Sequence, residues 1–173
     1  SLCTSGLYST WTTYGFTTPC AAVNVPYTEN FSTVTIPALP SCMSSVDVNG
    51  GNTWITDSTT TCTPTKALVY RYSSTLPGDD WAFTRGVNLT AGVTYELSFD
   101  VRGCTENKQE KLEIKYGNAN AVAGMTNLIY SNLNINTNSY QPARAGFTPA
   151  VSGIYYFGFH VISAANQFYL SID

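Results

Sequence analysis

Residues 79–102 read DDWAFTRGVNLTAGVTYELSFDVR, and this stretch decides the fold class. After a turn at Ala91 and Gly92, apolar or aromatic residues alternate with polar ones over residues 95–102. Successive side chains of a β-strand point to opposite faces, so the alternation predicts a strand with one buried face and one solvated face. The turn ahead of it predicts a hairpin with residues 83–89.

Short stretches of β-forming residues recur along the rest of the chain. They predict strands at residues 25–31, 67–72, 111–116, 128–135, 140–148, 154–162 and 167–173, another beginning at residue 43, and a short alanine-rich helix within 118–127. We therefore expect an all-β protein, a two-sheet antiparallel β-sandwich with jelly-roll topology and one short helix. Strand alternation predicts a core made of Trp81, Phe83, Leu97, Phe99, Leu112, Ile114, Phe157, Phe159, Leu170 and Ile172.

The composition limits the classes of function. The chain has 173 residues, 43% of them hydrophobic and only 11% charged, whereas roughly 25% is usual for a soluble domain. Its net charge is −3 and it contains no basic run, which excludes the phosphate contacts of a nucleic-acid-binding protein. No apolar run approaches the roughly 20 residues that a membrane-spanning helix requires. We expect the chain to be a fragment of a longer protein, since it lacks an initiator methionine and a signal peptide.

Five cysteines, at positions 3, 20, 42, 62 and 104, form no CxxC pair, and the single histidine cannot complete a zinc site. Disulfides in an oxidising compartment are the better interpretation. We expect the pairs Cys20–Cys42 and Cys62–Cys104. The first would pin the connector and the first strand to the sandwich, and the second would join the ends of two predicted strands if these are antiparallel neighbours in a suitable register. Cys3 would then pair with a cysteine outside this chain.

Two motifs together resemble a known family. Asp79-Asp80-Trp81 is followed by LTAGVTYELSF at residues 89–99, and FTPAVSGIYYFGFHVIS occupies residues 147–163. Over residues 23–173 the chain resembles the choice-of-anchor J or cleaved-adhesin family, which comprises MAM-like jelly-roll modules of secreted and surface proteins of Bacteroidetes.

The first residues carry a second resemblance. Residues 1–19 are similar to the closing hairpin of a fibronectin type III-like module, which divides the chain into that hairpin and a jelly-roll domain at 20–173. A genuine first strand of the main domain is the alternative for residues 1–19, and the sequence leaves both open.

The family resemblance implies an extracellular module, export by the type IX system, and adhesion or ligand binding. It also implies structural calcium, with Asp79 and Asp80 as ligands and Glu29 and Asp173 as co-ligands if the first and last strands lie side by side. Calcium takes six to eight oxygen ligands. The alternative for Asp79 and Asp80 is a solvated turn.

A second oxygen-rich loop contains Asp47, Asn49 and Asn52. It is less acidic than the D-x-D-G-D loop of many family members, and ordinary turn chemistry explains these residues without an ion. The sequence therefore offers this loop as a second possible metal site.

Catalytic motifs are missing from the sequence. His160 stands alone on a predicted strand and no GxSxG nucleophile motif is present, so we do not expect an enzyme. Trp54, Tyr156 and Tyr169 are candidates for stacking on a sugar ring, and their alternative role is to cover a sheet of the sandwich.

These observations predict a non-catalytic extracellular binding or adhesion module whose ligand is a surface glycan or a protein. We expect it to be joined to neighbouring domains of the same polypeptide. A carbohydrate-binding module of a secreted hydrolase and a structural spacer in a surface filament are the alternatives. We expect a secreted or bacterial cell-surface location, calcium as the cofactor, and neither nucleic-acid binding nor membrane insertion.

Overall fold

The computed structural model describes residues 20–58 and 65–173. Within them the secondary structure is almost entirely strand. The elements are β1 (Val23–Asn24), β2 (Ser44–Asp47), β3 (Trp54–Asp57), β4 (Ala67–Arg71), β5 (Asp80–Phe83), β6 (Val87–Leu89), β7 (Tyr95–Arg102), β8 (Glu110–Gly117), the 3₁₀ turn η1 (Val122–Gly124), β9 (Asn127–Ile135), β10 (Gln141–Phe147), β11 (Gly153–Val161) and β12 (Tyr169–Ile172). No helix in this part of the chain is long and apolar enough to cross a membrane.

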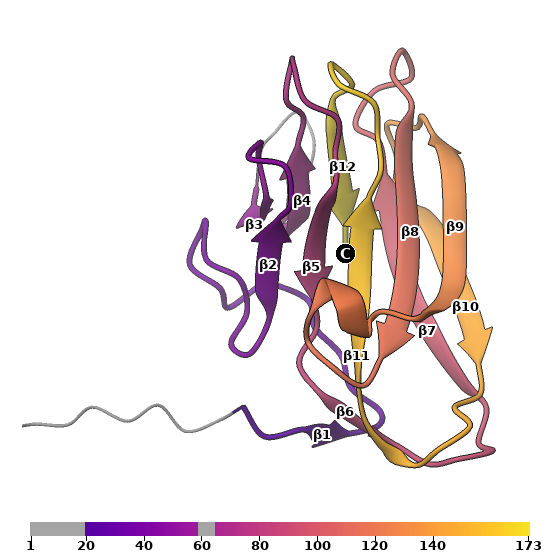
Figure 1. Ribbon diagram of the computed structural model, residues 1–173. Coiled ribbons are helices and arrows are strands. Elements are labelled where there is room, and N and C mark those ends of the chain that lie inside the picture. Colours follow the sequence, from indigo (N-terminus) through magenta and orange to yellow (C-terminus); the bar gives the residue numbers. More distant parts are fainter. Residues whose placement is uncertain (1–19, 59–64) are drawn as a thin grey trace, which may run out of the picture.

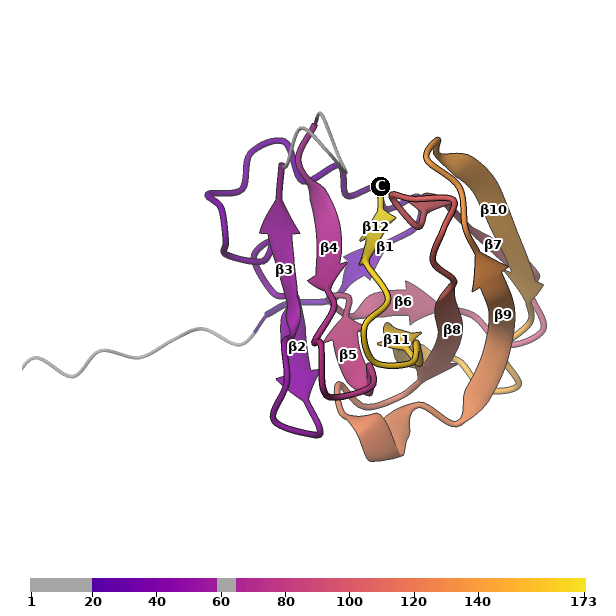
Figure 2. The ribbon, with the colours of Figure 1, turned by 90° about the horizontal axis from the view of Figure 1, so that it is seen from above.

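The strands form two sheets packed face to face (Figures 1 and 2). The smaller sheet has the order β10-β7-β12-β4-β3. The larger sheet has the order β1-β6-β11-β5-β2, with β8 pairing β11 and β9 pairing β8. All pairs are antiparallel except β1 with β6. The predicted β-sandwich of jelly-roll type is confirmed.

The main core lies between the sheets and follows the predicted alternation. In β8, Leu112 and Ile114 are fully buried, and in β12 Leu170 and Ile172 are buried in the same cluster. Phe99 of β7 meets Phe159 edge to face at a ring distance of 5.9 Å. Aromatic pairs of this geometry add to the free energy gained by burying their area.

Two residues of the predicted core lie elsewhere. Trp81 and Phe83 are buried, but with Met125 they form a second hydrophobic cluster, separate from the main core. The inward residue of β5 is Ala82, which belongs to the main core. Gly158 makes room for the second cluster, because a Cβ there would lie 2.9 Å from the Trp81 ring. Strand parity was correct for β5, but the face assigned to the core was wrong.

The predicted hairpin is also wrong. Residues 87–89 form β6, which pairs with β1 and β11 in the larger sheet, whereas β7 lies between β10 and β12 in the smaller sheet. The segment around Ala91 and Gly92 therefore crosses from one sheet to the other. A glycine turn between two strands signals a change of direction, but it does not specify that the two strands pair.

The predicted helix is reduced to the three residues of η1. Forming a first helical turn is unfavourable, and so short a segment has little length over which to recover that cost. Gly117 lets the loop fold tightly against the end of β8, since a Cβ there would lie 1.7 Å from the Gly124 carbonyl oxygen.

The predicted Cys20–Cys42 disulfide is present, with a Cα–Cα distance of 5.5 Å. Cys104 is also disulfide-bonded. Its predicted pairing with Cys62, the fate of Cys3 and the domain boundary at residue 19 all involve residues outside the described part of the chain, so they stay predictions.

Candidate functional site

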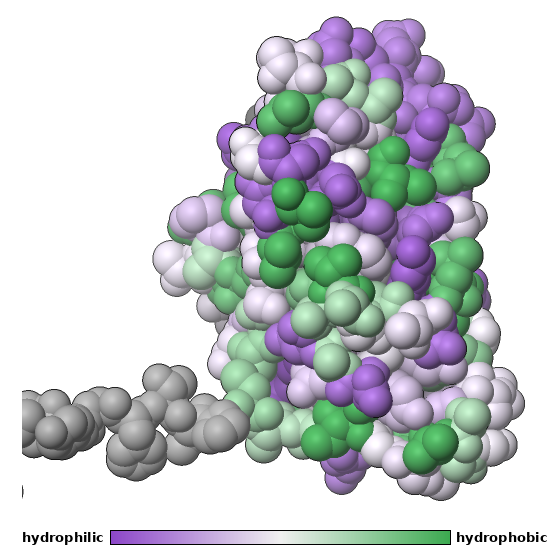
Figure 3. Space-filling view, viewed as in Figure 1, coloured by the Kyte–Doolittle hydropathy of each residue, from purple (hydrophilic) through white to green (hydrophobic). Residues whose placement is uncertain are grey.

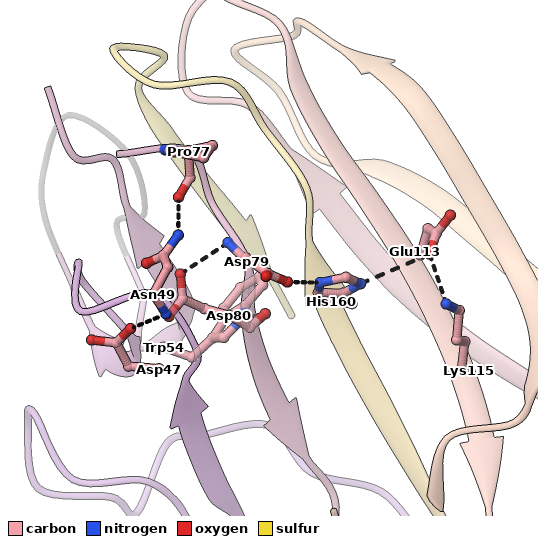
Figure 4. Close-up of polar contacts among 9 residues, drawn as sticks. All are labelled: Asp47, Asn49, Trp54, Pro77, Asp79, Asp80, Glu113, Lys115 and His160. Atoms are coloured by element: carbon pink, nitrogen blue, oxygen red, sulfur yellow. Dashed lines mark hydrogen bonds and ion pairs between the residues drawn. The ribbon is translucent and has the colours of Figure 1, made fainter. Parts of the chain in front are cut away.

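Asp79 lies in a polar chain on the outer side of the larger sheet (Figure 4). Its Oδ1 is 2.7 Å from Nε2 of His160 on β11, and the other imidazole nitrogen is 3.8 Å from a carboxylate oxygen of Glu113 on β8. Lys115 completes the chain at 3.1 Å from the Glu113 carboxylate. The imidazole also stacks on the Trp81 indole, with ring centroids 4.0 Å apart.

His160 is largely enclosed in this arrangement. Burial lowers its pKa, while Asp79 and then Glu113 act in the opposite direction. Within the described part of the chain, the imidazole contacts two carboxylates and an indole. None of these groups is a hydroxyl or thiol nucleophile. The arrangement suits a structural imidazole that ties β5, β11 and β8 together.

Asp80 points to the opposite side of the sheet from Asp79. Its carboxyl group is fully buried, close to Asp47 on the neighbouring strand and to the hydroxyl of Tyr70. Burial, reinforced by the Asp47 carboxylate, raises the Asp80 pKa to about 6. Oδ1 of Asp80 has no well-formed hydrogen bond despite these neighbours.

The loop after β2 brings further oxygens to the same place. Oδ1 of Asp47 accepts backbone N–H groups of Asn49, Gly50 and Gly51 at 3.0, 2.7 and 3.2 Å. The Asn49 amide nitrogen donates to the Pro77 carbonyl at 2.6 Å, and its Oδ1 is buried without a hydrogen-bond partner. Asn49 and Asp80 therefore each have a buried oxygen without a hydrogen-bond partner, in the same group of residues as Asp47 (Figure 4).

The structure regroups the predicted metal ligands. Asp80 joins Asp47 and Asn49, which belonged to the other predicted set, whereas the side-chain nitrogen of Asn52 donates to the Tyr72 carbonyl at 2.8 Å. Across residues 20–58 and 65–173, no three His, Cys, Asp or Glu side chains form a group that could hold a metal ion. The set Glu29, Asp79, Asp80 and Asp173 is thus not assembled in this form.

Glu29 and Asp173 are related in a different way from the predicted one, because they line the same cavity. The strand predicted at residues 25–31 is wrong, because these residues form a loop, so they do not pair with the last strand. β12 pairs with β4 and β7 instead. Both carboxylates instead line one cavity of about 500 Å³ between the sheets. Burial, followed by the nearby Asp100, raises the pKa of Asp173.

The three stacking candidates have different surroundings. Trp54 is only 1% exposed and donates its indole N–H to the Asp80 carbonyl at 3.0 Å, so its predicted exposure is wrong. Tyr156 is half-buried against the cluster of Trp81 and Phe83. Tyr169 is half-buried too, but it lies in a group of rings at the start of β12.

Tyr72, Phe168 and Tyr169 make up this group, which we call the aromatic triad. Phe168 and Tyr169 have ring centroids 4.5 Å apart, and Tyr72 lies 6.0 and 6.1 Å from them. The Arg71 guanidinium lies 5.8 Å from the Tyr169 ring centre and is held by Asp57 at 2.5 Å. The triad presents several half-buried ring faces in a fixed arrangement.

The buried Glu110 positions the triad. One of its carboxylate oxygens accepts the Phe168 backbone N–H at 2.6 Å and the other accepts the Ser163 hydroxyl at 2.5 Å. Burial raises the Glu110 pKa, and both hydrogen bonds oppose that rise. The loop that carries Phe168 is therefore fixed to the start of β8.

An open hollow rich in amide side chains adjoins the same loop. Its volume is about 350 Å³, and its lining residues are Glu106, Asn107, Lys108, Gln109, Asn134, Asn136 and Gln167. Gln109 donates a side-chain hydrogen bond to Asn134 and its backbone N–H to Gln167, each at 2.8 Å. Gln167 precedes Phe168, so the amide hollow and the aromatic triad share one loop. In Figure 3 the upper end of the molecule near β8 and β9 is correspondingly hydrophilic.

Sequence reasoning missed the hollow and two of the three triad residues. Tyr72 and Phe168 read as ordinary strand residues, and Gln109 as part of a polar turn. The available signal was the excess of amides in three loops, but only the fold shows that these loops meet.

Comparison with known proteins identifies relatives in fold only. No protein-family model matches the chain, and no curated protein matches it in sequence. The K1 cleaved adhesin domain of Lys-gingipain from Porphyromonas gingivalis W83 has the same fold, with a TM-score of 0.66, 14% identity, and coverage of 84% of this chain and 92% of that one. The K2 cleaved adhesin domain of Lys-gingipain has a TM-score of 0.64 at 11% identity, and the match covers 85% of this chain and 94% of that one.

A carbohydrate-binding module of family 61, solved in complex with β-1,4-galactotriose, is a more distant neighbour. Its TM-score is 0.54 at 13% identity, and the match covers 77% of this chain and 85% of that chain. At these identities the comparisons establish a shared jelly-roll fold, which confirms the fold-level part of the predicted resemblance. The choice-of-anchor J assignment and the fibronectin-like start of the chain stay predictions.

Proposed function

We propose that this chain is a non-catalytic extracellular binding module that holds a glycan where the aromatic triad meets the amide hollow. The observation that carries the proposal is the combination of ring faces and amide groups on one loop. A sugar presents apolar C–H faces, which pack on aromatic rings, and hydroxyl groups, which exchange hydrogen bonds with amides. Secretion to a bacterial surface by the type IX system is part of the same proposal.

The arrangement supports binding better than catalysis. The aromatic triad is prepared in advance by Glu110, by Arg71 and by the backbone bond from Tyr72 N–H to the Phe168 carbonyl at 3.0 Å. Groups ordered before binding lose little conformational entropy when the ligand arrives. Two of the structural neighbours are adhesin domains and a third is a carbohydrate-binding module, and a binding role agrees with their names.

A glycan array followed by calorimetry on the best hit tests the proposal. Replacing Tyr169 by Ala should weaken binding about tenfold or more, as the loss of a central aromatic contact does elsewhere. Tyr156→Ala is the matched control, because Tyr156 is an equally half-buried tyrosine on the other sheet. Replacing Gln109 or Gln167 by Ala should reduce affinity and change the preferred sugar.

Three other results would overturn the glycan assignment. Binding to a protein but to no glycan would favour protein adhesion at this surface. Absence of any ligand would favour the structural spacer. An equal loss in Tyr169→Ala and Tyr156→Ala would show that the ligand site is not at the triad.

We further propose that calcium binds between the β2 loop and β5. Asp47, Asn49 and Asp80 would hold it, and the unsatisfied buried oxygens of Asn49 and Asp80 support this choice. Calcium accepts carboxylate and amide oxygens and completes its shell with water. When bound, it would neutralise two carboxylates that face each other across paired strands.

Thermal unfolding in EDTA and in millimolar calcium tests this second proposal. A ligand at 100 times its dissociation constant that binds only the folded state adds about 2.7 kcal/mol. We expect this gain in the wild type and in Asp79→Asn, but not in Asp80→Asn. Equal midpoints with and without calcium, or a gain that survives in Asp80→Asn, would contradict the site.

A further inference from the structure

A cavity between the two sheets has no role in the glycan proposal. It measures about 500 Å³, within the range of roughly 300–1,000 Å³ typical of small-molecule sites. Its base reaches Phe157 and Phe159 of the main core, one wall is β7 around Leu97, and the other wall is the loop of residues 25–31. Most side chains around it are apolar or aromatic.

The loop wall is held in place rather than left to close over the cavity. The Lys66 ammonium donates to the carbonyls of Ser32 and Val34 at 3.1 and 2.6 Å. Phe31 is 5% exposed and anchors the loop in the core, and its backbone N–H donates to Glu29 at 2.8 Å. The opening therefore exists before any ligand arrives, which lowers the cost of binding.

The charged side chains that line the cavity are all acidic. Three carboxylates line it, those of Glu29, Glu96 and Asp173, and its described lining contains no lysine, arginine or histidine. Glu96 is engaged by Arg144 at 2.7 Å. Glu29 and Asp173 have no cation among the cavity's own residues. Arg85, which acts on Tyr27 at the rim, donates its hydrogen bond to the Ala21 carbonyl. A positive group at the rim would therefore be attracted and an anion repelled.

Aromatic rings line the same space. Tyr95 stacks on Phe147 at 5.9 Å, and Phe147 meets Phe157 edge to face at 5.3 Å. The faces of such rings attract cations, and sites for quaternary ammonium groups are built in this way. An apolar interior with aromatic walls and an anionic rim is complementary to a molecule with an apolar body and a cationic head.

We propose that this cavity binds an organic cation, an amine or quaternary ammonium group on an apolar body, with the body between the sheets and the charge near Glu29 and Asp173. The site is separate from the aromatic triad. It gives the module a second ligand class that does not depend on glycan binding.

Calorimetry with three matched probes tests the proposal on the whole chain. The probes are 2-phenylethylamine, the neutral 2-phenylethanol and the anionic 3-phenylpropionate. The amine should bind about tenfold more tightly than the alcohol, the order expected from gaining one hydrogen bond to a charged group. The anion should bind more weakly than the alcohol.

Variants locate the site. The double variant Glu29→Gln with Asp173→Asn should bind amine and alcohol within about threefold of each other, a difference below one charged hydrogen bond. Glu96→Gln is the control and should keep the preference, because Arg144 already occupies that carboxylate. Leu97→Trp, which fills the cavity, should abolish binding of both probes, whereas Tyr169→Ala should leave it unchanged.

The wild-type measurement decides the matter even if a variant fails to fold. Absence of binding by both the amine and the alcohol would overturn the site. Equal affinity for all three probes would overturn the assignment of a cation. Loss of glycan binding in Tyr169→Ala with intact amine binding would show that the two ligands occupy separate sites.

Discussion

Asp79 and Asp80 are consecutive in the chain, yet they lie in two contrasting regions on opposite sides of the larger sheet (Figure 4). The Asp79 side chain is 48% exposed and bonds to His160 beside the Trp81 ring. Asp80 is fully buried among Tyr70, Trp54 and another carboxylate, Asp47. The outer acid has a partner that can carry positive charge, and the inner acid faces one that repels it.

The difference shows that a carboxylate inside the protein needs a further interaction, because burying its charge costs free energy. A buried carboxylate is tolerated when it is paired, protonated or bound to a cation. Asp79 is paired with His160, whereas Asp80 can only be protonated or bind a cation. The following experiments separate the two regions, from the largest expected effect to the smallest.

Removing the indole from the inner region should have the largest effect. Trp54 is fully buried against Tyr70 at a ring distance of 5.8 Å, and it donates a hydrogen bond to the Asp80 carbonyl. Trp54→Ala should lower the free energy of unfolding by about 3–5 kcal/mol, measured by urea denaturation. The exposed Val46 on the outer side is the control, and Val46→Ala should cost less than about 0.5 kcal/mol. Similar costs for both would mean that the inner region is not packed as described.

Asp80 should make stability depend on pH. Its pKa is raised in the folded state from 3.8 to about 6, so the folded protein holds this proton more tightly than the unfolded chain. The stabilisation is complete below pH 3.8 and is lost as the pH rises to about 6, a loss on the order of 3 kcal/mol.

Asp80→Asn tests this dependence in EDTA. The variant should be more stable than the wild type at pH 7 and should lose this advantage at pH 3.5, as followed by urea denaturation across the range. Asp79→Asn is the control from the outer region and should not reproduce the effect. The prediction would be contradicted if the stability of the wild type rose between pH 4 and 6 and Asp80→Asn showed the same pH dependence.

In the outer region the single histidine of the chain permits a direct measurement. Burial lowers the His160 pKa from 6.5, and the bond to Asp79 counteracts it. A proton titration by NMR should therefore give a pKa below 6.5 in the wild type and a lower value still in Asp79→Asn. Because the unfolded chain binds this proton more readily, His160 reduces stability as the pH falls through 6.5. A pKa that rises in Asp79→Asn would show that this hydrogen bond does not favour the protonated imidazole.

The smallest effect is expected at the rim of the smaller sheet. Arg144 and Glu96 form an ion pair at 2.7 Å, with side chains 69% and 52% exposed. Exposed pairs contribute about 0–1 kcal/mol and are screened by salt. Arg144→Gln should change stability by less than that amount, and the change should shrink in 0.5 M salt. A larger effect would show that exposed charge matters here as much as the buried Asp80.

Alternation in the sequence predicted most strands of the sandwich, because a period of two is a local property, although residues 25–31 form a loop and β3 was not predicted. Leu112 and Ile114 in β8, and Leu170 and Ile172 in β12, lie on the buried face as predicted. The same pattern could not tell which of two faces is the main core when both are apolar. For that reason Trp81 and Phe83 were placed in the wrong cluster.

The candidate sites were predicted less well, since they depend on pairing between distant segments. The sequence singled out Asp47, Asn49 and Asp80, but in two separate sets, and the pairing of β2 with β5 brings them together. Tyr169 was recognised as a stacking candidate. Its partners Tyr72 and Phe168 were not, because adjacent strands, not adjacent residues, create the aromatic triad.

The sequence by itself determined the all-β class, the parity of most strands and the Cys20–Cys42 disulfide, since these follow from periodicity and from the spacing of segments. Only the tertiary structure decided that β6 and β7 belong to different sheets and that Glu29 and Asp173 share a cavity. The physical reason is that backbone pairing is nearly independent of side-chain identity. Which strands meet is therefore settled by packing of the whole sandwich, and the sites follow from that choice.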